Sequence, residues 1–372
     1  MAVIAALVVV LSVVPRILGA VGLLPHGLLE LGWSDVLATW NDSRLPGHRL
    51  PYVDVPFAYP PVVGYIAGLV SLAATGYVTY AILWGLVIAA AAGAGAYSFA
   101  RHAGPRRTLV YWACAPQLLL LSGINFDVLA AVLLGLAAIA ARSGRGGRAG
   151  MLLALATATK LFPAVSAPVY VWRLLSTGER RRAIAVGIAF VGLLSAFYLP
   201  ASLAPFPTIG FVGAYAVGIA ANIDSPWVLL ERGIGALGID GHFAVLALTY
   251  VGFAITYLAL VLPRARIAKD PAIGFGLATV TLLLWSRLYS PQYSLWLLPF
   301  FVLLPLRARS FILLTTADLG VFFTIYPLTL VVAESDPFRP AFFAALFAFV
   351  ALRVVALIII WRDVSRVARI SV

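Results

Sequence analysis

Three carboxylates lie close together in the most polar stretch of the sequence, residues 32–61, which reads GWSDVLATWNDSRLPGHRLPYVDVPFAYPP. They are Asp35, Asp42 and Asp54. A carboxylate held at a dry, apolar interface becomes more basic and can accept a proton from a hydroxyl group. We therefore predict that Asp35 is a catalytic base. The alternative is that Ser34 or Asp35 only caps a short helix that begins there.

Aromatic residues accompany these acids. Trp40 precedes Asp54 and Tyr59 follows it. An aromatic ring offers a flat apolar face, which suits the face of a sugar ring. We predict that Asp54, Trp40 and Tyr59 bind substrate. The alternative for each ring is a place in the aromatic belt at a membrane surface.

A lysine stands alone in the apolar run ATATKLFPAV, at position 160. Only two of the 26 basic residues of the chain are Lys, so lysine is disfavoured in this sequence. A cation inside a membrane segment marks a functional site by default, and an ammonium is a compact point charge that suits a phosphate. We predict that Lys160 binds the phosphate of a lipid substrate. The alternative is that its long stem carries the charge to the membrane surface.

Two other polar groups flank apolar runs. Asp127 opens one run, and we predict that it binds substrate, although stabilising the helix dipole would account for it equally well. The second group, in WSRLYSPQYSLWLLPF, contains Arg287, Gln292 and Tyr293. We predict that these three residues contribute further contacts to the donor phosphate. The alternative is an ordinary polar turn around Pro291.

The remaining polar positions carry weaker signals. Asp224, Glu231 and Arg232, in IDSPWVLLERG, are interpreted as surface pairs of little energetic weight. There is no HExxH motif, Walker loop, Gly-rich dinucleotide turn or Cys/His cluster, so soluble nucleotides are poor candidates for the substrate. We predict no cofactor and no metal site, and a divalent metal is neither required nor excluded by this pattern.

The composition decides which elements must position these residues. The chain has 372 residues, of which 63% are hydrophobic and only 11% charged, and its mean hydropathy is +1.02. A soluble domain cannot hide that much apolar surface, so we predict an all-α polytopic membrane protein. The net charge of +12 lies mostly in short loops between apolar runs, which is typical of cytoplasmic loops and argues against nucleic acid as a partner.

The distribution of positive charge separates two topologies. In the first, residues 61–75 form an interfacial helix on the outer side, and residues 149–172 form two short helices that meet around Lys160 and Pro163. This arrangement places 18 Lys and Arg residues on the cytoplasmic side and six outside. In the second, each of these segments crosses the membrane once, and the split becomes 12 to 12. The first arrangement satisfies the positive-inside rule.

The favoured topology has about 12 transmembrane helices, with both termini in the cytoplasm. Residues 1–372 form a single transmembrane domain, with a first outer loop over 25–77 that contains the interfacial helix and a second outer loop over 200–241. Most of the acids fall on the outer side in this arrangement. Because acids have little influence on topology, their position is an independent indication that the chemistry takes place at the outer face.

The order of the motifs resembles a known family. An outer Asp follows the first span, and PYxDxPFxYPP, NxD at a span start, TKLFP and SPQYxLWLLP come after it in that order. This order resembles the GT-C fold of integral-membrane glycosyltransferases. Within that fold, the chain is similar to the polyprenol-phosphate-mannose-dependent mannosyltransferases, which include the phosphatidylinositol-mannoside mannosyltransferases. The chain departs from their pattern at Ala58, where many members carry Glu, and at Gln292 and Tyr293, where that branch tends to have a His pair.

The resemblance implies an inverting transfer of a sugar from a polyprenyl-phosphate carrier to a hydroxyl of a lipid or polysaccharide acceptor. It also implies that the reaction takes place at the non-cytoplasmic face and that Asp35 is the general base. Lys160 and Arg287 match the need for cations at the leaving phosphate. The donor is then a substrate rather than a cofactor, and membrane lipids surround the protein.

Two other classes of function are compatible with the sequence. A transporter or flippase of lipid-linked sugars would place charges near the middle of the membrane and would usually show repeat symmetry, and no such repeat is visible. A catalytically inactive homologue that acts as a scaffold in envelope assembly is the third possibility. The preference for Arg over Lys and the high Ala content indicate a GC-rich bacterial genome. We therefore predict a location in a bacterial plasma membrane.

Overall fold

Helices make up all the regular structure in the computed structural model, which describes residues 1–208 and 217–370. The longer helices are α1 (Ala2–Ala20), α2 (Asp35–Asp42), α3 (Pro61–Ala73), α4 (Tyr77–Ala103), α7 (Asp127–Arg142), α8 (Gly146–Thr159), α9 (Ser166–Ser176), α10 (Arg180–Leu203), α12 (Trp227–Ala236), α13 (Gly241–Thr256), α15 (Pro271–Trp285), α17 (Ala308–Leu330) and α18 (Arg339–Ile370). Shorter elements are α5 (Pro105–Thr108), α6 (Pro116–Leu121), α14 (Leu262–Ile267), α16 (Leu298–Leu303) and the 3-10 or π turns η1 (His26–Gly32), η2 (Leu109–Ala113), η3 (Phe162–Val165), η4 (Tyr257–Val261) and η5 (Pro291–Trp296). The predicted all-α class is confirmed.

Six helical stretches in the described ranges are long and apolar enough to cross a membrane. They are Ala2–Ala20, Tyr77–Ala103, Arg180–Leu203, Gly241–Ile267, Ala308–Leu330 and Arg339–Arg369. These helices support a membrane protein. The predicted total of about 12 crossings also counts shorter helices, and it stays a prediction.

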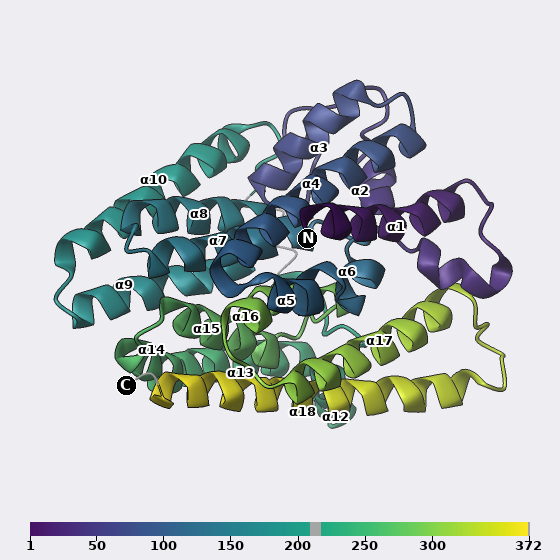
Figure 1. Ribbon diagram of the computed structural model, residues 1–372. Helices are drawn as coiled ribbons and strands as arrows, with labels where there is room; N and C mark the ends of the chain where they lie inside the picture. The colour runs from purple at the N-terminus through teal and green to yellow at the C-terminus, as the bar shows by residue number, and fades with distance from the viewer. Residues whose placement is uncertain (209–216, 371–372) are drawn as a thin grey trace.

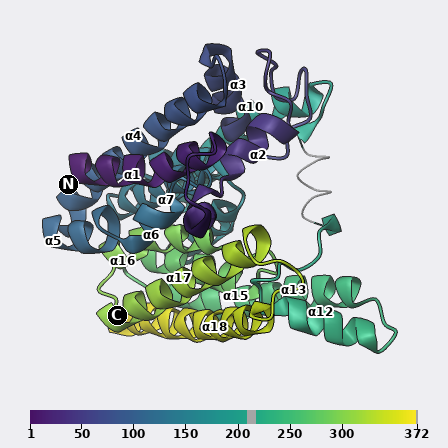
Figure 2. The same cartoon turned by 90° about the vertical axis from the view of Figure 1, so that its right-hand side faces the viewer.

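The two halves of the chain form two layers. In Figures 1 and 2 the purple-to-teal helices α1, α3, α4 and α10 occupy the upper part of the molecule, and the green-to-yellow helices from α12 to α18 occupy the lower part. Helix α7 lies between them and contacts α15 and α16 of the lower layer as well as α4 and α8 of the upper one. A site between the layers therefore draws residues from both halves of the sequence.

The apolar run over residues 149–172 is broken as predicted. Helix α8 ends at Thr159, Lys160 has the extended backbone angles φ −154° and ψ 142°, and α9 begins only at Ser166. Pro163 lies in the short η3 turn between them, where its missing N–H group does not interrupt a helical hydrogen-bond ladder. The 14 residues of α8 span about 21 Å, less than the roughly 30 Å of a hydrocarbon core. Helix α8 is therefore too short to cross a membrane, and Lys160 lies at its C-terminal end.

The predicted interfacial segment is helix α3. Pro61 takes the first helical position, where proline is favoured. Tyr52 lies against Gly64 of this helix, and its hydroxyl donates a hydrogen bond to the backbone oxygen of Tyr59 at 2.6 Å. This hydrogen bond holds the backbone of Tyr59 in a fixed position, and the Tyr59 side chain lies towards the centre of the molecule. Whether α3 lies along the membrane surface stays a prediction.

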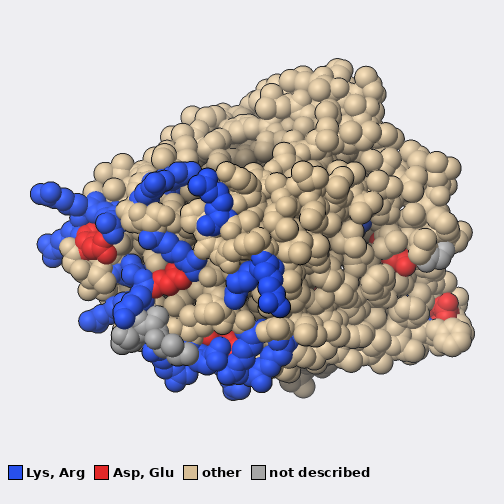
Figure 3. Space-filling model, in the orientation of Figure 1, with Lys and Arg blue, Asp and Glu red and all other residues tan. Residues whose placement is uncertain are grey.

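Charge is distributed unevenly along the helix axes. Figure 3 shows the Lys and Arg side chains concentrated on the left-hand part of this face, where Figure 1 places the α9–α10 turn, α14 and the C-terminal end of α18. The right-hand part shows acids and almost no basic side chains. Asp127 begins α7 and Arg142 ends it, so about 24 Å of helix separates that acid from the basic end.

Gly64 offers a test of the contact between α3 and Tyr52. A Cβ atom at position 64 would lie 2.2 Å from the Tyr52 hydroxyl oxygen, which is far too close. We expect Gly64→Ala to lower the free energy of unfolding by about 1–3 kcal/mol because Tyr52 must move, measured as a lower thermal unfolding midpoint in detergent. The matched control is Gly187→Ala in α10, where a Cβ atom meets nothing within 4 Å. An equal loss of stability in both variants would contradict the expectation.

Candidate active site

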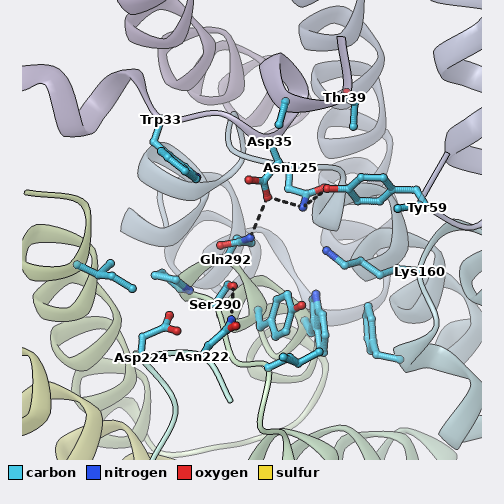
Figure 4. Close-up of a pocket in the computed structure, with 18 of the residues that line it drawn as sticks. Trp33, Asp35, Thr39, Tyr59, Asn125, Lys160, Asn222, Asp224, Ser290 and Gln292 are labelled. Atoms are coloured by element: carbon cyan, nitrogen blue, oxygen red, sulfur yellow. Dashed lines mark hydrogen bonds between the residues drawn. The ribbon is translucent and has the colours of Figure 1, made fainter. Parts of the chain in front are cut away.

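A cavity of about 670 Å³ lies between the two layers. The upper layer contributes the start of α2, residues 58–60, Asn125 and residues 160–162 to its wall. The lower layer contributes residues 222–224, 288, 290–293, 296, 325, 326 and 329. Figure 4 shows these side chains converging on one space. The cavity lies where α7 begins and where α8, α15 and α17 end, which is the opposite end of α7 from Arg142.

Asp35 points into this cavity from the first turn of α2. Ser34 caps that helix, since its Oγ accepts a hydrogen bond from the Val36 N–H at 3.2 Å. The Asp35 carboxylate is therefore not used as the cap. Its Oδ2 accepts hydrogen bonds from Asn125 Nδ2 at 2.7 Å and from Gln292 Nε2 at 3.4 Å (Figure 4). One oxygen is thus held in place by amides from both layers.

The surroundings make the Asp35 carboxylate more basic. Burial raises its pKa to about 6, against the partly opposing effect of the Lys160 charge. Asp127 raises the pKa further, and the hydrogen bond from Asn125 lowers it. A base with a pKa near 6 is mostly ionised at neutral pH and still accepts a proton readily. These properties are those required of the catalytic base predicted from the sequence, and that role stays a prediction.

Lys160 faces the cavity as one half of a buried ion pair. Its Nζ lies 2.7 Å from Oδ1 and 2.8 Å from Oδ2 of Asp127, whose side chain is completely buried. Trp296 of the lower layer donates its indole N–H to Asp127 Oδ1 at 2.6 Å. Asp127 therefore lies behind Lys160 and positions it, and the structure does not place Asp127 among the cavity-lining residues.

Aromatic rings form the wall beside Lys160. Phe162 and Trp296 stack with their ring centres 3.8 Å apart and 3° between their planes, and Trp296 and Tyr293 stack at 4.1 Å. The Lys160 Nζ lies 5.0 Å from the centre of the Tyr293 ring. Three parallel apolar faces thus adjoin a single ammonium. We refer to Lys160, Phe162, Tyr293 and Trp296 as the cationic wall.

A second group of polar side chains comes from the lower layer. Asn222 Nδ2 donates to Ser290 Oγ at 3.4 Å, and the carboxylate of Asp224 lies beside them (Figure 4). Asp224 is only 2% exposed, so its interpretation as a surface residue is wrong. Residues 222–224 line the cavity between the two layers. Burial raises its pKa to about 7, although Arg353 lowers it. We refer to Asn222, Asp224 and Ser290 as the polar wall.

Besides Asp127, three of the predicted site residues lie away from the cavity wall. Asp54 Oδ2 accepts a hydrogen bond from the Leu50 N–H at 2.8 Å and closes an exposed turn. Trp40 packs on Tyr80 of α4, with ring centres 4.8 Å apart. Arg287 donates to the backbone oxygens of residues 217 and 219, which anchors the chain leading to the polar wall. Their predicted contacts with substrate stay predictions.

The other predicted residues come together. Asp35, Tyr59, Lys160, Gln292 and Tyr293 all line the cavity. Asn222, Asp224 and Trp296 also belong to the site, although no pattern in the sequence around Asn222 or Trp296 predicts this and Asp224 is predicted at the surface. The sequence marks Asp224 only as an acid in a Pro-containing loop that is predicted to lie on the outer side of the membrane. Among residues 1–208 and 217–370, no three His, Cys, Asp or Glu side chains are grouped so as to hold a metal ion.

The raised pKa of Asp35 predicts a cost in stability. The folded state binds this proton more tightly than an exposed Asp does, so ionisation lowers stability as pH rises through about 4 to 6. We expect Asp35→Asn to stabilise the protein at pH 7.5, by up to about 3 kcal/mol, and to have little effect near pH 4. Thermal unfolding at both pH values measures this. A destabilised variant at pH 7.5 would contradict the expectation.

The Lys160–Asp127 pair predicts a stability effect that a second change reverses. Lys160→Met leaves a buried, uncompensated carboxylate, which costs about 3–5 kcal/mol. We expect Lys160→Met combined with Asp127→Asn to recover most of this loss, because the amide oxygen still accepts from Trp296. Unfolding midpoints of the single and double variants measure the coupling. If the double variant is no more stable than Lys160→Met, the pair is not the source of the loss.

Comparison with known proteins adds to this geometry. No curated protein matches the chain. The model of glycosyltransferase family 87 matches residues 57–291, which is more than half of the 372 residues. The matched stretch contains Tyr59, Asn125, Lys160 and Asp224 of the cavity wall, and it begins after Asp35. On the strength of this match, the chain belongs to glycosyltransferase family 87.

Proposed function

We propose that the protein is an inverting glycosyltransferase that moves a sugar, mannose by its resemblance, from a polyprenyl-phosphate carrier to a hydroxyl group of a lipid or glycan acceptor. Membership of glycosyltransferase family 87 supports glycosyl transfer. The observation that carries the rest is that Asp35 and Lys160 face one cavity (Figure 4). A base and a phosphate-binding cation are the two charged groups that this reaction needs.

The proposed reaction is a single displacement, in which the acceptor oxygen replaces the lipid phosphate at the anomeric carbon. Asp35 Oδ takes the proton of the acceptor hydroxyl while the acceptor oxygen forms a bond to the anomeric carbon. The bond from that carbon to the phosphate oxygen breaks, and the lipid phosphate leaves with the electron pair. Asp35 becomes a neutral carboxylic acid. General base catalysis of this kind contributes about 10²–10⁴-fold to a rate.

Lys160 has the capacity to hold the leaving phosphate. An ammonium has three N–H donors, and the Asp127 carboxylate engages at most two of them. One donor remains for a phosphate oxygen, and the Lys160 side chain is 14% exposed where it lines the cavity. A fixed cation placed where negative charge develops lowers the barrier without reorganisation during the reaction.

The charge distribution supports a reaction at the non-cytoplasmic face. The cavity and the basic end lie at opposite ends of α7, and basic loops favour the cytoplasm. A polyprenyl-phosphate donor is suited to this place because its headgroup lies at the membrane surface while its chain stays in the lipid. The bacterial plasma membrane remains the location we propose.

Replacing Asp35 tests the reaction directly. We expect membranes that contain Asp35→Asn to transfer a radiolabelled sugar from a polyprenyl phosphate at least about 10²-fold more slowly than wild type. In the wild type, the rate should fall about tenfold per pH unit below about pH 6, where Asp35 becomes protonated. The control is Asp240→Asn, since Asp240 only caps α13 and asparagine caps equally well. Wild-type transfer by Asp35→Asn at equal expression would remove Asp35 from this role.

The double variant of the ion pair separates stability from catalysis. Lys160→Met combined with Asp127→Asn should fold, yet we expect its transfer rate to fall about 10²–10³-fold because the leaving phosphate has lost its cation.

The same preparations test the alternative that the protein is a transporter. Uptake of a lipid-linked sugar into vesicles by the wild type, without any product, would favour a flippase over an enzyme.

A further inference from the structure

Asp224 of the polar wall and the neighbouring Gln292 each have an acceptor atom with no partner in the part of the chain that the structure describes. Asp224 is 2% exposed, and its Oδ2 has no hydrogen-bond partner among residues 1–208 and 217–370. Gln292 is 4% exposed and its Oε1 is likewise unpaired within those ranges. Buried polar atoms are nearly always hydrogen-bonded. Both side chains line the cavity, so a ligand seated there can supply the missing donors.

The neighbouring arginine does not satisfy Asp224. Arg353 NH1 donates to the backbone oxygen of Asp224 at 3.1 Å, and its Nε lies 2.8 Å from the Asp318 carboxylate. Its guanidinium also lies 4.3 Å from the centre of the Tyr289 ring. These contacts fix the Asp224 backbone and engage the cation elsewhere, which leaves the carboxylate turned to the cavity (Figure 4).

Charge divides the cavity into two parts. Lys160 is the single Lys or Arg among the described lining residues, and it belongs to the cationic wall. The polar wall offers a carboxylate, an amide and a hydroxyl, and Asp35 adds a second carboxylate near it (Figure 4). Above about pH 7, where both acids are ionised, they repel an anionic ligand and accept hydrogen bonds from hydroxyl groups.

The geometry of an inverting reaction assigns an occupant to each part. The acceptor oxygen approaches the anomeric carbon from the side opposite the leaving phosphate. If the phosphate is held at Lys160, the acceptor comes from the side of the cavity away from it. Figure 4 shows Asp224 and Asn222 at the lower left of the cavity and Lys160 on its right, with Asp35 above both groups.

We propose that Asp224, together with Asn222 and Ser290, binds hydroxyl groups of the acceptor, and that the acceptor group seated there is an uncharged sugar rather than a phosphorylated one. This inference rests on the proposed glycosyl transfer. Asp224 is then a binding residue that selects the acceptor, and Asp35 remains the base.

Direct binding tests this assignment without requiring transfer. The probes are octyl α-mannoside and octyl α-glucoside, below their micellar concentrations, and the 6-phosphate of each. Trp33 and Trp296 line the cavity, so tryptophan fluorescence of the purified protein in lipid nanodiscs reports binding. We expect wild type to bind a neutral glycoside at least about tenfold more tightly than its phosphate. Asp224→Asn should weaken neutral binding by about tenfold or more, since a hydrogen bond to a charged group is lost.

A matched control separates this effect from misfolding. Asp240→Asn makes the same chemical change at an exposed helix cap and should bind like wild type. Asp224→Asn keeps the shape of the side chain, and its thermal unfolding midpoint confirms that it folds. Unchanged glycoside binding by Asp224→Asn, equal binding of the phosphates by wild type, or binding of neither probe would overturn the proposal.

Transfer measurements distinguish failure of this inference from failure of the proposed function. With a polyprenyl-phosphate sugar as donor, we expect Asp224→Asn to raise the KM for the neutral glycoside about tenfold and to leave the KM for the donor unchanged. Normal transfer with an unchanged acceptor KM would remove Asp224 while the glycosyltransferase stands. Glycoside binding that depends on Asp224 but no transfer by wild type would retain the sugar site and reject the reaction.

Discussion

The ion pair between Lys160 and Asp127 holds the site together. An ammonium cannot lie among apolar side chains without a counter-charge, and Asp127 supplies it from the first residue of α7. Trp296 binds the same carboxylate from the lower layer. One buried acid therefore fixes the end of α8, the start of α7 and the η5 turn relative to one another. The stacked rings and the position of the Lys160 charge follow from that junction.

The two carboxylates of the cavity are in a different situation. Among the described residues, neither Asp35 nor Asp224 forms an ion pair, and burial raises the pKa of each, to about 6 and about 7. Structural stability alone would favour amides at both positions. Sites that bind and activate hydroxyl groups commonly retain such unfavourable charges, because the ligand supplies the missing hydrogen bonds. Both acids thus lower stability, which is what their proposed roles in base catalysis and acceptor binding predict.

Much of the fold could be predicted because membranes constrain sequences strongly. The composition indicates an all-helical membrane protein, and the distribution of Arg residues selects a helix break at Lys160 that the backbone shows. Because lysine is rare in this sequence, Lys160 stands out as a candidate site residue. Asp35 could be chosen because it follows the first apolar run in a dense polar stretch. These signals are local, and they arise from what a lipid bilayer excludes.

The rest of the site depends on contacts between distant segments. Trp40 and Tyr59 are both aromatic residues of the polar stretch 32–61. Trp40 nevertheless packs on Tyr80, whereas Tyr59 lines the cavity. The sequence around Asp224 is that of an ordinary polar loop. The contact that fixes its backbone comes from Arg353, which is 129 residues away. Arg287 has the charge expected for a phosphate site, but carbonyls of its own layer engage it. Nothing in the local sequence distinguishes these outcomes.

The division of the cavity between two layers has a consequence for biosynthesis. A ribosome releases the upper layer first, and chains fold in the order in which they emerge. Asp35 and Lys160 are then already synthesised, but Gln292, Tyr293 and Trp296 are still being translated. The cavity is complete only when the segments from Asn222 onward have packed against the upper layer. A nascent or truncated chain therefore contains Asp35 and Lys160 without the rest of the cavity wall.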